Sequence, residues 1–120
     1  MEKTIKLSNH RVLVKGGGEM ATGVACRLHK SGFKILITEI ERPIAVRRKV
    51  SFCEAVYDGQ TVVEGVEAIL VKTVDDVYMA WDKKRIPLLV DPQCESRISI
   101  KPDVIVDAIL AKKKYGDSLR

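Results

Sequence analysis

The sequence has little of what several classes of protein require. Aromatic residues make up only 5% of its 120 residues, which leaves little surface for stacking nucleic-acid bases. No apolar stretch approaches the roughly 20 residues of a membrane span, and the N-terminus lacks the apolar block of a signal peptide. We therefore expect neither nucleic-acid binding nor membrane binding, and we expect a cytoplasmic location.

A cysteine motif is lacking as well. Cys26, Cys53 and Cys94 lie far apart and form no C-x-x-C pair. Such spacing indicates neither a zinc site nor a disulfide framework. We expect three reduced thiols and no metal site.

What the sequence does contain is enough apolar material for one folded domain. Hydrophobic residues make up 46% of the chain, and we assign residues 1–120 to a single domain. The 21 lysines and arginines exceed the 16 aspartates and glutamates, which gives a net charge of +5. The basic residues are spread along the chain apart from clusters at 47–49 and 112–114, as is typical of a solvated surface.

Short apolar runs alternate with amphipathic segments, a pattern typical of strands joined by helices in a parallel sheet. The spacing predicts helices over 19–31 and 74–81, and a broken helix or two short ones within 43–58. Residues 61–72 are interpreted as a hairpin around Gly65 whose second arm joins the main sheet. The five strands of that sheet are predicted at 11–15, 34–40, 66–72, 86–91 and 103–107.

Right-handed crossovers between these elements favour the strand order 3-2-1-4-5 in a Rossmann-like, three-layer α/β domain. The winding would then reverse between the first and fourth strands. Ligands of such sheets bind at that point, at the carboxyl ends of the strands. We expect the crevice to be lined by residues 16–18, Asp91 and Asp107.

A glycine turn follows the first strand directly and opens the first helix. Gly16, Gly18 and Ala21 fit the G-x-G-x-x-[GA] fingerprint of dinucleotide-binding domains, with Gly17 between them. The first glycine permits a tight turn, and the second lets the backbone approach a pyrophosphate. The small third residue lets the helix lie close to the sheet. The helix N-terminus would add N–H groups for the phosphates.

Glu39 ends the second strand 21 residues after Gly18, where an acid accepts hydrogen bonds from a ribose. An acid there disfavours a ribose 2′-phosphate, so the sequence predicts NAD rather than NADP as cofactor. Arg42, Arg47 and Arg48 follow closely and keep NADP as the lesser alternative. The other alternative is that the glycines only turn the chain.

Candidates for chemistry are few. Asp91 is placed to act as a base, metal ligand or substrate anchor, but Asp-Pro is also ordinary turn chemistry, in which the Asp side chain bonds the loop backbone. Asp107 and Lys112, at and beyond the end of the last strand, are the other candidates. Cys94 is expected on a loop at the same rim, as a reactive thiol or as an unreactive one.

Longer strings of the sequence carry a family resemblance. "RRKVSFCEAVYDG", "VEGVEA", "LLVDP" and "PDVIVDAILAKK" follow the glycine turn in this order. From about residue 11 to residue 114 the chain resembles the accessory proteins of the selenium-dependent molybdenum hydroxylase system. The resemblance implies a role beside bacterial xanthine-dehydrogenase-like enzymes, in delivering or inserting selenium at the molybdenum centre. The implied partners are such a hydroxylase or its other maturation proteins.

The resemblance has departures. Lys114, Tyr115 and Gly116 stand where the family continues with an asparagine and a glycine. Family members are also longer, with a further glycine-rich region, so the chain corresponds to an N-terminal part of such a protein or to a short relative. The matching positions include Gly16, Gly17, Gly18, Thr22, Gly23, Arg27, Glu39, Arg47, Arg48, Ser51, Asp91, Pro92, Asp107, Ala108, Ala111 and Lys112.

Three functions stay open on the sequence. The first is a nucleotide-binding accessory protein for maturation of the hydroxylase, which the resemblance implies. The second is an NAD-dependent oxidoreductase, against which stands the lack of a histidine, tyrosine or lysine placed for proton transfer. The third is a non-catalytic interaction domain with an empty glycine turn. The sequence also leaves open whether the chain forms a homo-oligomer.

Overall fold

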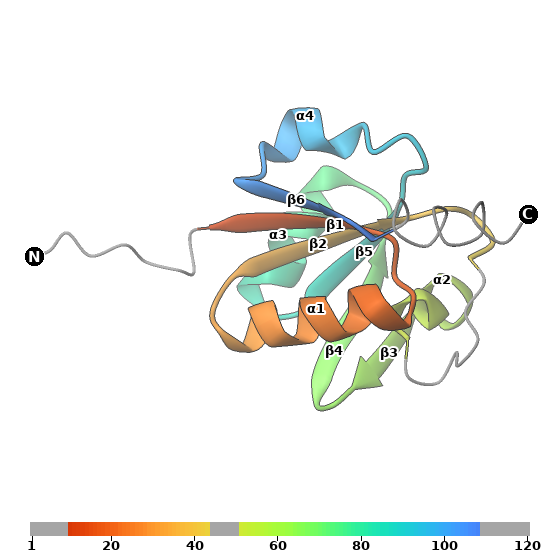
Figure 1. Cartoon of the computed structure of the whole chain (residues 1–120). Helices are drawn as coiled ribbons and strands as arrows, with labels where there is room; N and C mark the ends of the chain where they lie inside the picture. The colour runs from red at the N-terminus through yellow and green to blue at the C-terminus, as the bar shows by residue number, and fades with distance from the viewer. Residues whose placement is uncertain (1–9, 44–50, 109–120) are drawn as a thin grey trace, which may run out of the picture.

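The computed structural model describes residues 10–43 and 51–108 (Figure 1). They form an α/β fold with a six-stranded, mostly parallel sheet and helices on both faces, which confirms the α/β class. The elements in chain order are β1 (Arg11–Lys15), α1 (Glu19–Lys30), β2 (Lys34–Glu39), the 3-10 helix η3 (Phe52–Glu54), α2 (Ala55–Asp58), β3 (Gln60–Val63), β4 (Val66–Val71), α3 (Val74–Asp82), β5 (Ile86–Val90), α4 (Ser96–Ile100) and β6 (Val104–Asp107).

The strands are arranged in the order β3-β4-β5-β2-β1-β6. Only β3 is antiparallel to its neighbour, because it forms with β4 the hairpin expected around Gly65. Five strands were predicted, and the hairpin's first arm is the sixth. Numbered among the five parallel strands, the order is 3-4-2-1-5, so the predicted order 3-2-1-4-5 is wrong.

The position of β5 beside β4 avoids crossing other strands at the connection between them, whereas the later connection from β5 to β6 passes both β2 and β1. The nine residues of α3 carry the chain from β4 to the strand beside it. The predicted order required the same connection to cross two strands. Both orders satisfy the right-handed rule, which therefore could not choose between them.

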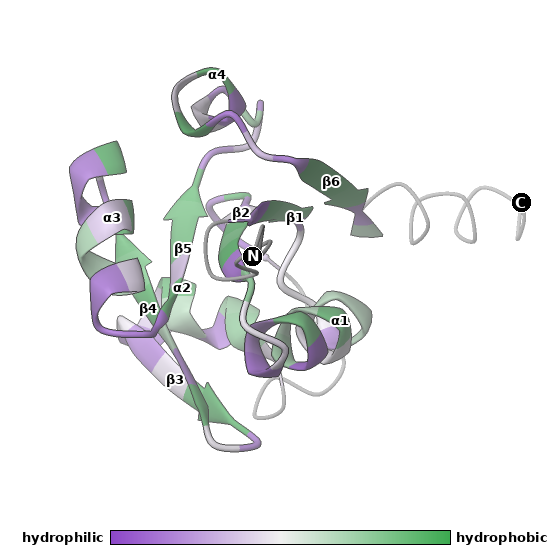
Figure 2. Cartoon of the chain, turned by 90° about the vertical axis from the view of Figure 1, so that its left-hand side faces the viewer, coloured by the Kyte–Doolittle hydropathy of each residue, from purple (hydrophilic) through white to green (hydrophobic). Residues whose placement is uncertain are grey.

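Two apolar clusters lie on the two faces of the sheet. Figure 2 shows α1 on one side of the sheet and α3 on the other. On one face α1, η3 and α2 pack against alternate residues of β1 and β2, such as Val12 and Ile37. On the other face α3 and α4 pack against the intervening residues, such as Leu13 and Leu36. Burial on both faces explains why these strands are apolar almost throughout.

The helix ends agree with their sequence signals in two places. Gly32, just after α1, adopts a φ of +103°, a conformation that glycine accepts without strain. The Thr73 side chain caps α3 by accepting a hydrogen bond from the Asp76 N–H at 3.1 Å. At Ser51, the N-cap residue of η3, no side-chain cap forms.

Some expectations differ from the structure or fall outside it. Helix α4 was not predicted, because its five residues are too few to show a periodic apolar pattern. Residues 52–58 form two short helical segments, whereas 44–50, with Arg47 and Arg48, lie outside the described residues. Lys112 lies outside them too.

The winding reverses at a different place from the one predicted. The chain leaves β2 toward the α1 face and leaves β5 toward the α3 face, and these two strands are neighbours. The reversal point therefore lies between β2 and β5. Glu39 ends β2, and Asp91 follows β5 directly.

Candidate functional site

The carboxyl edge of the sheet brings most of the predicted site residues together. The neighbouring strands β5, β2, β1 and β6 end there in that order. The backbone N–H of Asp91 donates to the carbonyl of Glu39 at 2.8 Å, and that of Gly16 donates to the carbonyl of Thr38 at 2.7 Å. Asp91, Glu39, the glycine turn and Asp107 thus follow one another along a single edge.

Hydrogen bonds hold the glycine turn, residues 16–18, against Phe52 and Cys53 at the start of η3. The Cys53 N–H donates to the Gly17 carbonyl at 2.8 Å. A Cβ at Gly17 would lie 3.0 Å from the Cys53 nitrogen, so any other residue there would require the Cys53 backbone to shift. The Thr22 hydroxyl donates to the Gly17 carbonyl at 3.2 Å and accepts from the Phe52 N–H at 2.8 Å.

The sequence did not predict these hydrogen bonds between the glycine turn, Thr22 and η3. Thr22 and Ser51 appear among the positions that match the family resemblance, and this was the available signal. Gly16 adopts a φ of +101°, which fits its predicted role in a tight turn. Ala21 is buried where α1 meets the sheet, as a small residue at this position should be.

Glu39 is bonded to the turn itself. Its side chain is only 7% exposed. One carboxylate oxygen accepts from the Gly17 N–H at 2.6 Å, and the other accepts from the Ile40 N–H at 2.9 Å. The N–H groups of Gly16 and Gly17 are therefore both used inside the protein.

At this end of the sheet, within the described residues, the N-terminus of α1 offers a place for an anion. Gly18 is its N-cap residue and supplies no side-chain cap, and the N–H groups of a first helical turn have no intrahelical acceptor. These groups favour an anion. Glu19, in the same turn, adds a negative charge close by.

Asp91 caps the chain that follows it. Its two carboxylate oxygens accept from the N–H groups of Glu95 at 3.0 Å and Ser96 at 2.8 Å. Burial raises the pKa of Asp91, but the hydroxyl and N–H of Ser96, the N–H of Glu95 and the charge of Arg97 together hold the pKa below its usual value. This arrangement is the turn chemistry weighed for Asp-Pro.

Asp107 lies beside the glycine turn in an ion pair. Lys15 at the end of β1 faces it in the register, with 3.4 Å between the Lys15 Nζ and an Asp107 oxygen. The two side chains are 32% and 34% exposed, so solvent screens the pair.

The three cysteines are all buried thiols. Cys94 lies in the loop after β5 and is buried, with its Sγ 4.0 Å from the Thr38 hydroxyl, which favours the unreactive alternative. Burial, followed by the nearby charge of Glu64, raises the pKa of Cys26. Within 10–43 and 51–108, no three His, Cys, Asp or Glu side chains gather as a metal site would require.

Comparison with known proteins finds one similar chain, described as "Uncharacterized protein YqeB" of Escherichia coli (strain K12). The two are 41% identical over 117 residues, which is 97% of this chain. The chain spans only 22% of the length of that relative. No family model and no solved structure matches the chain. No helix in the described part of the chain is long and apolar enough to cross a membrane.

Proposed function

We propose that this Rossmann-like domain binds NAD at the carboxyl edge of its sheet and serves as an accessory protein in maturation of a selenium-dependent molybdenum hydroxylase. One observation carries the nucleotide part of the proposal. The N-terminus of α1 opens beside the Glu39 carboxylate, which is joined to the glycine turn through the 2.6 Å bond from the Gly17 N–H. A phosphate subsite and a ribose acceptor are thus adjacent.

The binding mode follows from the groups that are still free to bond. The diphosphate would lie at the N–H groups of the first turn of α1, next to Gly18. A carboxylate offers about four acceptor sites, of which backbone N–H groups take two at Glu39. The ribose hydroxyls would use the others. A 2′-phosphate would meet a buried negative charge, and this favours NAD over NADP.

The maturation role rests on the family resemblance, and part of the resembling sequence contacts the glycine turn. The string "RRKVSFCEAVYDG" is among the more specific parts of the resemblance, and its residues 51–54 hold the glycine turn through Cys53 and Phe52. A segment that shapes the turn links the resemblance to the proposed site. The proposed partners are the hydroxylase and its other maturation proteins. Because the Asp91 and Asp107 carboxylates are already bonded, we assign no proton transfer to them.

Isothermal titration with NAD, NADP, AMP and pyrophosphate tests nucleotide binding. We expect NAD to bind and Gly18→Val to abolish binding, because a side chain there would cover the N–H groups of α1. Gly23→Ala is the matched control, since a Cβ at Gly23 meets no atom within 4 Å. The proposal fails if NAD gives no heat, or if Gly18→Val binds NAD as the unchanged protein does.

Cofactor preference gives a second readout. Replacing Glu39 with Gln removes the charge that would repel a 2′-phosphate. We expect the ratio of NADP to NAD affinity to rise in Glu39→Gln, measured on variant protein shown to be folded by circular dichroism. An unchanged ratio would remove Glu39 from the ribose site.

The maturation role is tested in a bacterium that makes both this chain and a selenium-dependent hydroxylase. Deleting the coding sequence should lower the selenium content per molybdenum of the purified hydroxylase. The unchanged chain should restore the content and the Gly18→Val variant should not. A normal selenium content after deletion would contradict the role and leave nucleotide binding to be judged by titration.

A specific observation also favours a non-catalytic interaction domain. Two of the three glycine N–H groups already donate to acceptors of the protein, namely the Thr38 carbonyl and the Glu39 carboxylate. A turn closed in this way needs no ligand. Absence of binding for all four titrants would favour this second function.

A further inference from the structure

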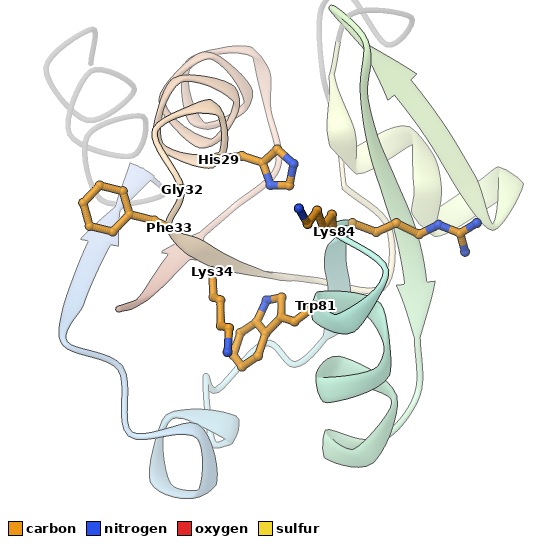
Figure 3. Close-up of a pocket in the computed structure, with 7 residues that line it drawn as sticks. His29, Gly32, Phe33, Lys34, Trp81 and Lys84 are labelled. Atoms are coloured by element: carbon orange, nitrogen blue, oxygen red, sulfur yellow. The ribbon is translucent and has the colours of Figure 1, made fainter. Parts of the chain in front are cut away.

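A second candidate site lies at the other end of the sheet, where the parallel strands begin (Figure 3). A cavity of about 280 Å³ opens where β2 and β5 begin, far from the glycine turn at their other ends. It is lined by His29, Gly32, Phe33, Lys34, Trp81, Lys84 and Arg85. Neither the fingerprint nor the family resemblance drew attention to these residues.

The strand pairing explains why a cavity forms here. The pairs between β2 and β5 run from Ile37 with Leu88 to Glu39 with Val90, at the carboxyl ends. Pro87 has no N–H with which to extend the ladder toward the amino ends. The Ile35 carbonyl instead accepts from the indole N–H of Trp81 at 2.9 Å. The indole thus lies where β2 and β5 begin and forms one wall of the cavity.

The cavity carries positive charge that is not neutralised. Among the described residues no carboxylate lies within 4.0 Å of the ammonium group of Lys34 or Lys84. Arg85, by contrast, is paired with Glu67 at 3.1 Å. Two lysines therefore supply the net charge of the site.

The lysines approach from separate elements. Figure 3 shows Lys84 pointing toward His29, and Lys34 running along the ring of Trp81. The Lys34 Nζ lies 5.9 Å from the centre of that ring. Burial lowers the pKa of His29 and so favours its neutral imidazole, which can form hydrogen bonds at the wall of the cavity.

The helix ends at this edge do not cancel the lysine charge. The C-termini of α1 and α3 would disfavour an anion through their exposed carbonyls. Loop N–H groups already bond four of these carbonyls: Gly32 donates to His29, Phe33 to Leu28, Lys84 to Trp81 and Arg85 to Ala80. Their negative potential is thereby reduced.

We propose that this cavity, which Lys34 and Lys84 line, binds a small oxyanion, a phosphate or carboxylate group carried by a compact organic molecule. Lysine ammonium groups are common partners of phosphate as point charges. The volume lies just below the range of pockets for drug-sized ligands, which are about 300–1,000 Å³. A small molecule with its apolar part against Trp81 fits this size. The proposal is independent of nucleotide binding at the other edge.

Tryptophan fluorescence tests the proposal directly, because Trp81 is the only tryptophan in the chain and lines the cavity. The probes are phenyl phosphate and benzoate, with benzyl alcohol as the uncharged comparison. We expect a saturable fluorescence change with at least one anion and none with the alcohol. The anion that binds identifies the phosphate or the carboxylate as the preferred group.

Matched variants distinguish binding inside the cavity from nonspecific attraction of anions to surface lysines. Lys84→Gln and Lys34→Gln should each weaken binding about five- to tenfold, as expected for loss of a charged partner. Lys83→Gln is the control, since Lys83 is exposed and adjacent but does not line the cavity. Equal weakening in all three variants would overturn the proposal. So would the absence of both a fluorescence change and an amide NMR shift at Gly32 and Arg85.

Discussion

The carboxylate of Glu39 accepts a hydrogen bond from the N–H of Gly17 at 2.6 Å, in a site where the Glu39 side chain is 7% exposed. The acid at the end of β2 thus helps to hold the glycine turn in place. In the proposed function the same carboxylate also receives a ribose. The two roles are compatible only because a carboxylate has more acceptor sites than the backbone uses here.

Removing this carboxylate should destabilise the fold. Glu39→Ala leaves the buried Gly17 N–H without its acceptor, and we expect the free energy of unfolding to fall by about 1–3 kcal/mol. Urea denaturation followed by Trp81 fluorescence measures the change. The control is Glu41→Ala, an exposed acid two residues later. Equal stability of the two variants would show that the bond to Gly17 contributes nothing.

Two glycines in the same region should respond in opposite ways to alanine. At Gly17 a Cβ would lie 3.0 Å from the nitrogen and 3.2 Å from the Cα of Cys53, so backbone must move. We expect Gly17→Ala to lower the free energy of unfolding by about 1–3 kcal/mol. Gly23 lies inside α1 in open space, and Gly23→Ala should raise it by about 0.5–1 kcal/mol. Thermal unfolding of both variants checks the pair, and a change of the same sign would contradict it.

Asp91 should contribute stability that depends on pH. Its pKa in the folded protein lies below the usual value of 3.8, so the contribution is present above about pH 4 and is lost as the pH falls through the folded pKa. We expect Asp91→Asn to cost about 0.5–2 kcal/mol at pH 7, as for loss of a helix cap. The cost should shrink toward zero in acid.

Urea denaturation at a series of pH values measures this dependence. Asp82→Asn, at an exposed position at the end of α3, is the control. At each pH the stability of that variant is compared with the stability of Asp91→Asn, so that loss of an exposed carboxylate elsewhere is controlled for. A pH-independent cost for Asp91→Asn would show that the charge of Asp91 is not involved.

The indole of Trp81 should be needed for more than its apolar surface. Trp81→Phe removes the N–H that donates to the Ile35 carbonyl at 2.9 Å, at the place where Pro87 donates nothing. We expect the free energy of unfolding to fall by about 1–3 kcal/mol. Urea denaturation monitored by circular dichroism measures the change. Tyr78→Phe is the control, because it keeps the ring that packs edge-on against Trp81 and changes only a hydroxyl. Similar stability of both variants would contradict the expectation.

Local elements could be predicted where the signal is local. The spacing of apolar residues placed α1 and α3 almost to the residue, with Gly32 and the Thr73 cap at their ends. The hairpin at Gly65 was also predicted. Helix α4 was missed because it is short and because its capping groups come from Asp91, outside the helix.

The candidate site was predicted as a set of residues but not as a set of bonds. The carboxyl ends of parallel strands share one edge, and this put residues 16–18, Glu39, Asp91 and Asp107 together. Their partners could not be read from spacing. The Glu39 carboxylate bonds the turn, and the Asp91 carboxylate bonds the chain before α4.

The sequence by itself determined the α/β class, most of the elements and the edge at which the glycine turn lies, because periodicity, turns and caps act within a few residues. Only the tertiary structure decided that β5 lies between β2 and β4, that Cys53 closes on Gly17, and that Lys34 and Lys84 share a cavity. Each of these depends on packing between segments far apart in the chain. Local preferences and the handedness rule allow several such packings, and the contacts between whole elements select one.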